Sequence, residues 1–203
     1  IDANVGGQTL TISPVTLNNN GTLKATAGTL SLAPSASTTS WTNSGTVLVS
    51  AGATLNTNSR SLVNNGVVGG SGTINLGGTG HVLTNNGTLR PGSSPGFLTI
   101  TGDLTLAPAS TTDFEMSGSA RGVDPGYDSI HATGNVTINP TAAAKLIYLG
   151  PFATTGTNVG DTFIAITAGG TVSGTFDTVV PPVGASGPQA FLPQTLGNTV
   201  FLQ

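Results

Sequence analysis

The stretch Asn64-Asn65-Gly66-Val67-Val68, repeated 21 residues later as Asn85-Asn86-Gly87-Thr88-Leu89, decides the fold expected for this chain. The same pattern occurs earlier as Asn19-Asn20-Gly21-Thr22-Leu23 and Asn43-Ser44-Gly45-Thr46-Val47. The four glycines are therefore spaced by 24, 21 and 21 residues. A fixed period of this length is too short for a pair of helices and is typical of one coil of a β-helix.

Apolar residues within each period alternate with Thr, Ser or Asn, as in Leu10-Thr11-Ile12. This alternation predicts short strands with aliphatic side chains inward and hydroxyls outward. The single tryptophan, Trp41, occupies the apolar position that Leu62 and Leu83 fill in later periods, so we assign it to the core. Asn-Gly pairs tolerate positive φ and suit the corners, and stacked coils are expected to align the asparagines into ladders.

We therefore predict an all-β fold: a right-handed parallel β-helix, or β-solenoid, with about 21 residues per coil and a less regular β C-terminal region. Residues 1–106 are expected to form coils with Asn-Gly corners, and residues 107–203 a continuing β region with a C-terminal cap. A set of ordinary β-hairpins is the competing interpretation, because Asn-Gly is also the strongest short hairpin signal. Hairpins, however, require no fixed recurrence.

The composition argues against several classes of partner. Only 6% of the 203 residues are charged, and the net charge is −3 with no basic patch, which makes nucleic acid an unsuitable partner. No apolar run approaches the roughly 20 residues that span a bilayer, so membrane insertion is not expected. Cysteine is absent, which excludes disulfides and thiolate metal sites. A large Thr-, Asn- and Gly-rich chain of this kind is expected to be secreted or located on the bacterial cell surface.

The double Pro-Gly turn Arg90-Pro91-Gly92-Ser93-Ser94-Pro95-Gly96, with Phe97-Leu98-Thr99-Ile100 after it, resembles the motif of autotransporter passenger domains and related bacterial β-helical surface proteins. Two later stretches, Tyr127-Asp128-Ser129-Ile130-His131 and Gly160-Asp161-Thr162-Phe163-Ile164, resemble the parts that follow in such passengers. The resemblance covers roughly residues 60 to 203. It implies a parallel β-helix on the cell surface or secreted, and it carries no catalytic residues.

Acidic residues offer the main candidates for chemistry, and the stretch from Ala3 to Pro91 contains none. Asp113 and Glu115 lie two apart on one expected strand and share a face, so they form the best pair for acid-base work on a glycan. A solvated strand face is the favoured interpretation of this pair. Asp124 and Asp128 flank a Pro-Gly turn, where local backbone hydrogen bonds are favoured over calcium binding.

The remaining motifs do not indicate a cofactor or a metal. His81 and His131 lie 50 residues apart without a further ligand motif and are interpreted as surface or strand residues. Rows of outward threonine raise the alternative of an ice-binding surface. Thr9-Leu10-Thr11 and Thr99-Ile100-Thr101 have the required spacing, but the sequence does not place such units in register across the coils. We predict no enzyme activity, no cofactor and no metal site.

Both ends of the chain are uncharged and strand-like, as in Thr9-Leu10-Thr11-Ile12 and Thr199-Val200-Phe201-Leu202. Open strand edges pair readily with other chains. We therefore expect an extracellular structural protein, a self-assembling subunit or passenger segment of a bacterial surface fibre, that associates with itself head to tail or by strand addition. The expected interface residues are Leu10, Ile12, Val200, Phe201 and Leu202. The alternatives are an adhesin that binds glycan or another surface protein through the solenoid flank and, less favoured, an ice-binding protein or a glycan-cleaving enzyme.

Overall fold

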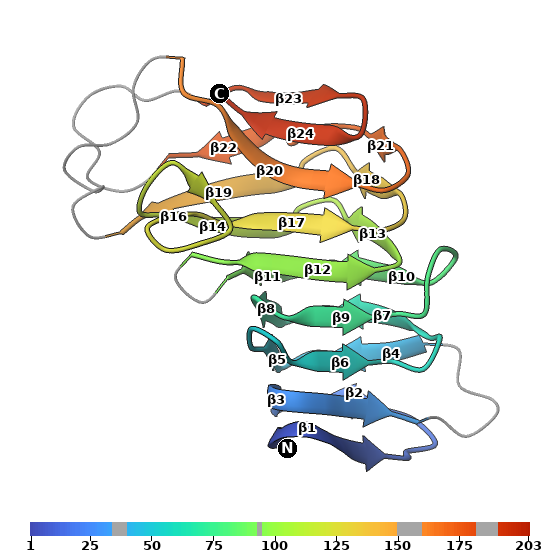
Figure 1. Cartoon of the computed structure of the whole chain (residues 1–203). Coiled ribbons are helices and arrows are strands. Elements are labelled where there is room, and N and C mark those ends of the chain that lie inside the picture. The colour runs from blue at the N-terminus through green and yellow to red at the C-terminus, as the bar shows by residue number, and fades with distance from the viewer. Residues whose placement is uncertain (34–39, 93–94, 150–159, 182–190) are drawn as a thin grey trace.

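The protein is an all-β stack that rises layer by layer from the N-terminus to the C-terminus (Figure 1). This computed structural model describes residues 1–33, 40–92, 95–149, 160–181 and 191–203, and every regular element in those ranges is a β-strand. The predicted all-β class is therefore confirmed. No helix long and apolar enough to cross a membrane occurs in the described ranges.

The strands fall into three columns, each named here after one of its members. The β7 column is a seven-stranded parallel sheet of β2 (Asn18–Asn19), β4 (Ser40–Asn43), β7 (Ser61–Asn64), β10 (Val82–Asn85), β13 (Asp103–Leu106), β18 (Val136–Ile138) and β21 (Val172–Ser173). The β5 column consists of β3 (Thr22–Leu32), β5 (Thr46–Val49), β8 (Val67–Gly70), β11 (Thr88–Pro91), β14 (Thr111–Met116), β19 (Ala143–Tyr148) and β22 (Thr178–Val180).

The β6 column starts with β1 and shares the long strand β3 with the β5 column. It consists of β1 (Asp2–Ile12), β3, β6 (Thr54–Asn56), β9 (Thr73–Asn75), β12 (Phe97–Thr101), β17 (Ser129–Ala132), β20 (Phe163–Ala168), β24 (Thr199–Leu202) and β23 (Pro193–Leu196). Together with the short strands β15 (Ala120–Arg121) and β16 (Gly126–Tyr127), the β5 and β6 columns make one curled 17-stranded mixed sheet.

The pairing register repeats the 21-residue period of the sequence. Trp41 pairs with Leu62, and Leu62 pairs with Leu83, all in parallel strands. Trp41 is fully buried, as predicted from its position in the repeat. Stacking like residues on like residues lets each layer bury the same aliphatic face against the next, which is how repeats too small to fold alone gain a continuous core.

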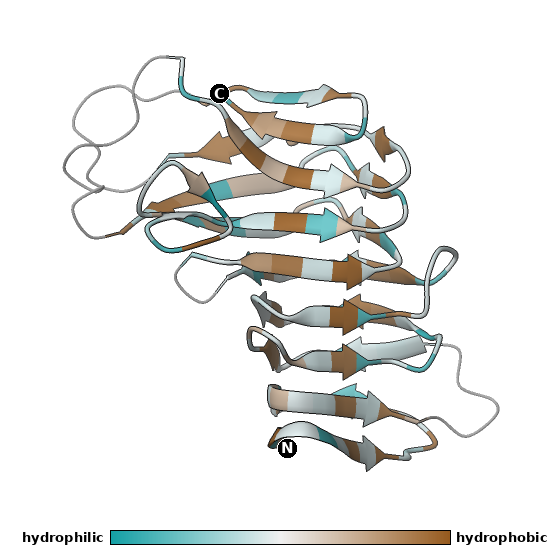
Figure 2. Ribbon diagram, viewed as in Figure 1, coloured by the Kyte–Doolittle hydropathy of each residue, from teal (hydrophilic) through white to brown (hydrophobic). Residues whose placement is uncertain are grey.

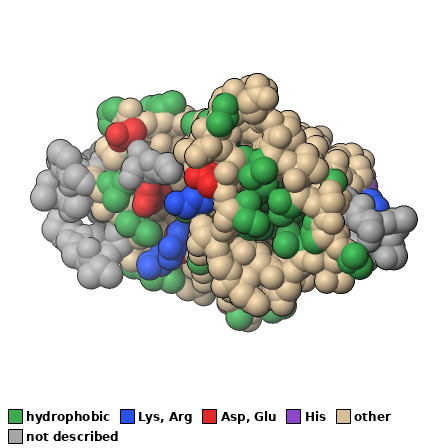
Figure 3. Space-filling view, turned by 90° about the horizontal axis from the view of Figure 1, so that it is seen from below, with side chains coloured by type: hydrophobic (Ala, Val, Ile, Leu, Met, Phe, Trp, Pro, Cys, Tyr) green, Lys and Arg blue, Asp and Glu red, His purple; other side chains and the backbone are tan. Residues whose placement is uncertain are grey.

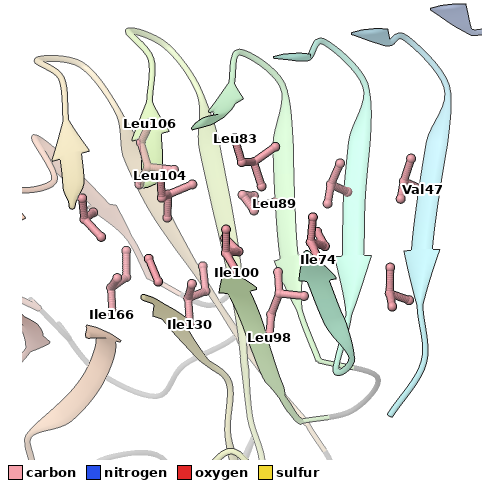
Figure 4. Packing of buried hydrophobic residues seen from close by; sticks show 14 of the residues in the cluster. Val47, Ile74, Leu83, Leu89, Leu98, Ile100, Leu104, Leu106, Ile130 and Ile166 are labelled. Atoms are coloured by element: carbon pink, nitrogen blue, oxygen red, sulfur yellow. The ribbon is translucent and has the colours of Figure 1, made fainter. Parts of the chain in front are cut away.

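Buried aliphatic side chains line the inside of the stack along its length. Ile74, Leu83, Leu89, Leu98 and Ile100 are all fully buried and point into the space between the columns (Figure 4). Along the strands, apolar residues alternate with polar ones, which produces the banded colouring of Figure 2. The predicted inward and outward alternation is confirmed, and its origin is the opposite direction of successive side chains in a strand.

Buried asparagines form the predicted ladder along the edge of the β7 column. Asn19 donates through Nδ2 to Oδ1 of Asn43, Asn43 donates to Asn64, and Asn64 donates to Asn85, each at 2.7 Å. Each of the four also donates to the carbonyl of the glycine two residues later. The ladder therefore satisfies the buried amide groups within the stack, and a buried amide without partners would oppose folding.

The glycines of the Asn-Gly units are required for a different reason than predicted. Gly21, Gly45, Gly66 and Gly87 do not have positive φ, which corrects the expected left-handed corners. A Cβ atom at Gly66 would instead lie against the carbonyl oxygen of Gly45, and one at Gly87 against the carbonyl oxygen of Gly66. These corners sit directly on one another, so a side chain has no room between the layers.

The upper layers are longer than the lower ones and lose the simple period. Leu104 pairs with Val136, 32 residues later, and Val136 pairs with Val172, 36 residues later. Part of the added length forms the excursion after β14 that carries β15 and β16. The stack ends in the antiparallel strands β24 and β23, which close its top (Figure 1). Strand pairing thus continues across residue 106 without a break in either sheet.

Candidate functional site

The N-terminal end of the stack leaves apolar side chains without a layer to cover them. Leu10 pairs with the buried Leu30, and Ile12 with the buried Leu32, so both occupy inward positions. Leu10 is nevertheless 40% exposed, because β1 is the first strand of its column. We call this surface the open end and define it by Ile1, Val5, Leu10, Ile12, Val15 and Leu17.

Seen from below, hydrophobic side chains gather near the middle of the view, mostly among uncharged side chains and backbone, with acidic and basic side chains to one side (Figure 3). The one acidic residue of β1, Asp2, accepts hydrogen bonds from the Oγ1 and backbone N–H of Thr26. The strand is irregular in its middle, where the register with β3 shifts between Asn4 and Thr9. The flat part of this edge is therefore Thr9 to Ile12, which carries the two aliphatic residues.

The C-terminal end differs from the prediction that both ends expose unpaired strands. β24 lies between β20 and β23 and pairs antiparallel with both, so it is not an edge. Val200 and Leu202 are buried in the core, and Phe201 is only half-buried on the opposite face. The outermost strand is β23, whose first residue, Pro193, has no N–H to donate. A short edge with a proline is a usual way to block strand addition.

A groove of about 450 Å³ runs along the β5 column and gathers charged residues. Asp113 is buried and accepts an ion-pair hydrogen bond of 3.0 Å from Nε of Arg90. Glu115 and Lys145 line the same groove, so the shared face predicted for Asp113 and Glu115 is confirmed. Sequence reasoning missed Arg90 and Lys145, which reach this face only because β11 and β19 flank β14.

Asp128 lies at the deep side of this groove and joins two distant segments. Its Oδ1 accepts from the backbone N–H of Gly96 at 2.6 Å, and its Oδ2 accepts from that of Glu115 at 2.8 Å. Burial raises the pKa of Asp128 to about 7, which outweighs the lowering effect of the two backbone hydrogen bonds, while the nearby Glu115 raises it further. Gly92 also packs against this carboxylate so closely that a Cβ would overlap it.

The predicted turn-stabilising role of the acids near residue 125 is divided between two sites. Asp124 accepts a hydrogen bond from Ser117 at 2.8 Å within its own excursion. Asp128 instead holds the Pro-Gly turn against β14. Within the described residues, no three His, Cys, Asp or Glu side chains converge as metal ligands.

Threonines on the β6 column stand in register, contrary to the sequence interpretation. Thr9, Thr29, Thr54, Thr73 and Thr99 occupy one row across five successive strands. The neighbouring row contains Thr11, Ser31, Asn56, Asn75 and Thr101. Several members of this second row are used internally: Ser31 and Asn56 bind Asn58, and Asn75 binds Thr101. A free two-row array of hydroxyls, as an ice-binding surface needs, is therefore not formed.

His131 belongs to a surface cluster higher in the same column. Its ring stacks on Phe97 with ring centroids 6.4 Å apart, and the guanidinium carbon of Arg121 lies over the Phe97 ring, 5.1 Å from its centroid. Thr167 contacts both His131 Nδ1 and Arg121 Nη2. These contacts tie the excursion to the stack, which agrees with the interpretation of His131 as a strand residue.

Neither the scan against protein-family models nor the search of curated proteins returns a match to this chain. The open end and the groove are therefore the two features of this protein that bear on its function.

Proposed function

We propose that this protein is a right-handed parallel β-helix that acts as an extracellular structural element of the bacterial cell surface, similar to an autotransporter passenger, and associates with a second copy of itself without catalysis. The parallel 21-residue register supports the β-helix. The observation that carries the association is the open end, where inward-facing aliphatic residues lack a covering layer.

The aliphatic side chains of the open end favour binding to the open end of a second copy of the protein. Within the stack, the row that begins at Leu10 continues as Leu30, Leu55 and Ile74, each covered by the next layer. An occupant that continues this row must itself present aliphatic residues on a flat strand. The open end of a second copy meets that requirement, because Leu10 and Ile12 project from its flat segment as well.

The contrast between the two ends favours contact between like ends. At the C-terminal end, the short strand β23 with Pro193 forms the outer edge of the β6 column, and the core residues Val200 and Leu202 beneath it are buried. A contact between two open ends is isologous and closes at two copies. The product is a rod of two stacks with a C-terminal cap at each tip, rather than the head-to-tail fibre expected from the sequence.

Substitution of Leu10 by lysine tests the association. Sedimentation velocity of the purified chain, from low micromolar to near-millimolar concentration, should give a monomer–dimer equilibrium. Leu10→Lys should raise the dimer dissociation constant at least about tenfold, since it places a charge within an apolar contact. Val123→Lys and Leu196→Lys are matched controls, because Val123 and Leu196 are 53% and 74% exposed and lie away from the open end.

Circular dichroism of each variant confirms that the stack is folded before association is measured. A wild-type chain that stays monomeric at the highest concentration contradicts the proposal. Equal weakening by Leu196→Lys, or open-ended filaments in electron micrographs, contradicts the like-end contact and returns the assignment to a head-to-tail polymer.

A further inference from the structure

Three of the five basic side chains of this protein project from one row of the β5 column. Lys24 pairs with Leu48, Leu48 with Gly69, and Gly69 with Arg90. The next layer places Asp113 beside Arg90, and Asp113 pairs with Lys145. Five steps of about 4.8 Å separate Lys24 from Lys145, which gives a line about 24 Å long. We call these three residues the cation row.

The cation row is more accessible than the acids beside it. Lys24, Arg90 and Lys145 are exposed, whereas Asp113 and Asp128 are buried and Glu115 is half-buried. Arg90 uses only Nε in its ion pair, and no other hydrogen bond of its guanidinium is found in the described residues. Lys24 and Lys145 make no ion pair within the same ranges. Positive charge is thus turned to solvent along a chain of net charge −3.

A continuous hollow accompanies the cation row. The groove of about 450 Å³ adjoins a second hollow of about 260 Å³ lined by Lys24, Thr26 and Ser50, and the two share Leu48 and Gly70. Gly69 deepens the row because it occupies an outward position without a side chain. The result is a trough along the stack with cations at intervals and aliphatic surface between them.

We propose that this trough binds an extended acidic polysaccharide, with its sugar carboxylates on Lys24, Arg90 and Lys145. One layer of the stack is close in length to one pyranose of a linear chain, so a polymer lying along the stack would meet Arg90 about three sugar units from Lys24, and Lys145 about two units further on. The half-buried Glu115 offers an acceptor for sugar hydroxyls at the same level. Alternating carboxylate and hydroxyl groups therefore match the mixed lining of the trough.

Two other acidic polymers fit the trough less well. Single-stranded nucleic acid is bound by aromatic side chains on which bases stack, and none of the described residues that line the two hollows is aromatic. An extended peptide that gains affinity from main-chain hydrogen bonds binds by adding a strand to a free sheet edge. The central strands of the β5 column pair on both sides and offer no such edge.

Titration calorimetry with a hexamer of galacturonic acid tests the proposal on the wild-type chain and on Lys24→Gln/Lys145→Gln. We expect the double variant to lose at least about tenfold in affinity, and wild-type binding to weaken as salt rises. Arg60→Gln removes one cation outside the cation row and is the charge-matched control for Lys24→Gln and Lys145→Gln measured singly; it should leave the affinity unchanged. Both lysines are exposed, so the variants should melt as the wild type does.

The proposal is overturned by no binding of the hexamer at low salt, by unchanged affinity in the double variant, by equal loss in Arg60→Gln, or by equal binding of a neutral glucose hexamer. Equally tight binding of poly-glutamate shows attraction of charge alone and also overturns it. The test is independent of the proposed association, because the open end and the trough share none of their defining residues.

Discussion

The lower and upper halves of the stack bury polar groups in different ways. In the lower layers, the ladder of Asn19, Asn43, Asn64 and Asn85 carries no charge at any pH, and every link has the same length. In the upper layers, the corresponding task falls to Asp128, a single ionisable carboxylate between Gly96 and Glu115. Layers of equal length can satisfy their buried polar groups with the same uncharged asparagine in each layer. Layers of unequal length do not repeat that geometry, so each needs its own hydrogen-bonding residue.

The largest expected effect is on how the free energy of unfolding depends on pH, and it comes from the upper half of the stack. The folded-state pKa of Asp128 is raised from 3.8 to about 7, so its contribution to stability is fully present below about pH 4 and is lost as the pH rises through 7. This difference corresponds to about 4 kcal/mol in the free energy of unfolding. Urea unfolding at pH 4 and pH 8 should show this loss in the wild type but not in Asp128→Asn. Asp124→Asn is the control and should behave as the wild type does; parallel curves for wild type and Asp128→Asn would refute the assignment.

The next largest effect concerns the neutral ladder. Asn64→Ala removes the acceptor of Asn43 and the donor to Asn85, and both partners stay buried. We expect the free energy of unfolding to fall by about 3 kcal/mol, independent of pH between 4 and 8. Asn86→Ala removes an exposed ladder bond to Asn65 and should cost less than about 0.5 kcal/mol. Equal costs for the two variants would mean that burial of the ladder is unimportant.

A smaller effect is expected from the aromatic contacts that replace the regular aliphatic rows at the top of the stack. Phe163 meets Tyr127 edge-on at 5.1 Å and contacts Phe191 at 6.3 Å. Phe163→Leu keeps an apolar side chain but loses these ring contacts, and should lower the free energy of unfolding by about 1.5 kcal/mol. Thermal unfolding checks this value, and Phe201→Leu, at a half-buried position of the neighbouring strand β24, should have little effect in the same measurement.

The smallest effect has the opposite sign. Thr112 continues an inward row that is apolar in the layers below, where Val47, Val68 and Leu89 stand, and its buried Oγ1 has no hydrogen-bond partner within the described residues. Thr112→Val should therefore raise the free energy of unfolding by about 1 kcal/mol. Thr111→Val, at the half-exposed neighbour, should change it by less than about 0.5 kcal/mol. A destabilised Thr112→Val would show that the hydroxyl is satisfied in solution.

Most of the lower half was predictable because its information is local and repeats. The alternation of Leu10-Thr11-Ile12, the position of Trp41 and the asparagine ladder all followed from the period. The glycine corners were assigned to the correct residues for the wrong reason, since the need for glycine comes from the layer below and not from φ. The closure of the C-terminal end was missed, because β23 reaches β24 by an antiparallel pairing that has no counterpart in the repeat.

The candidate sites were predictable only in part. Leu10 and Ile12 were named correctly as residues of the N-terminal end, and Asp113 and Glu115 as one face. The cation row was not foreseen, since Lys24, Arg90 and Lys145 are separated by stretches of unequal length. These three residues fall into one row only because of the number of residues in each layer between them, which the sequence does not show.

The sequence by itself determined the all-β class, the layer period and which side chains face inward, because strand alternation and a fixed repeat act between neighbours along the chain. Only the tertiary structure decided which end stays open, which carboxylate is buried and which charges share a row. Those features arise between segments that meet although they lie 13 to 36 positions apart, and the unequal layer lengths set their partners. The open end and the cation row are therefore surfaces that form only when the layers stack, and the repeat alone does not specify them.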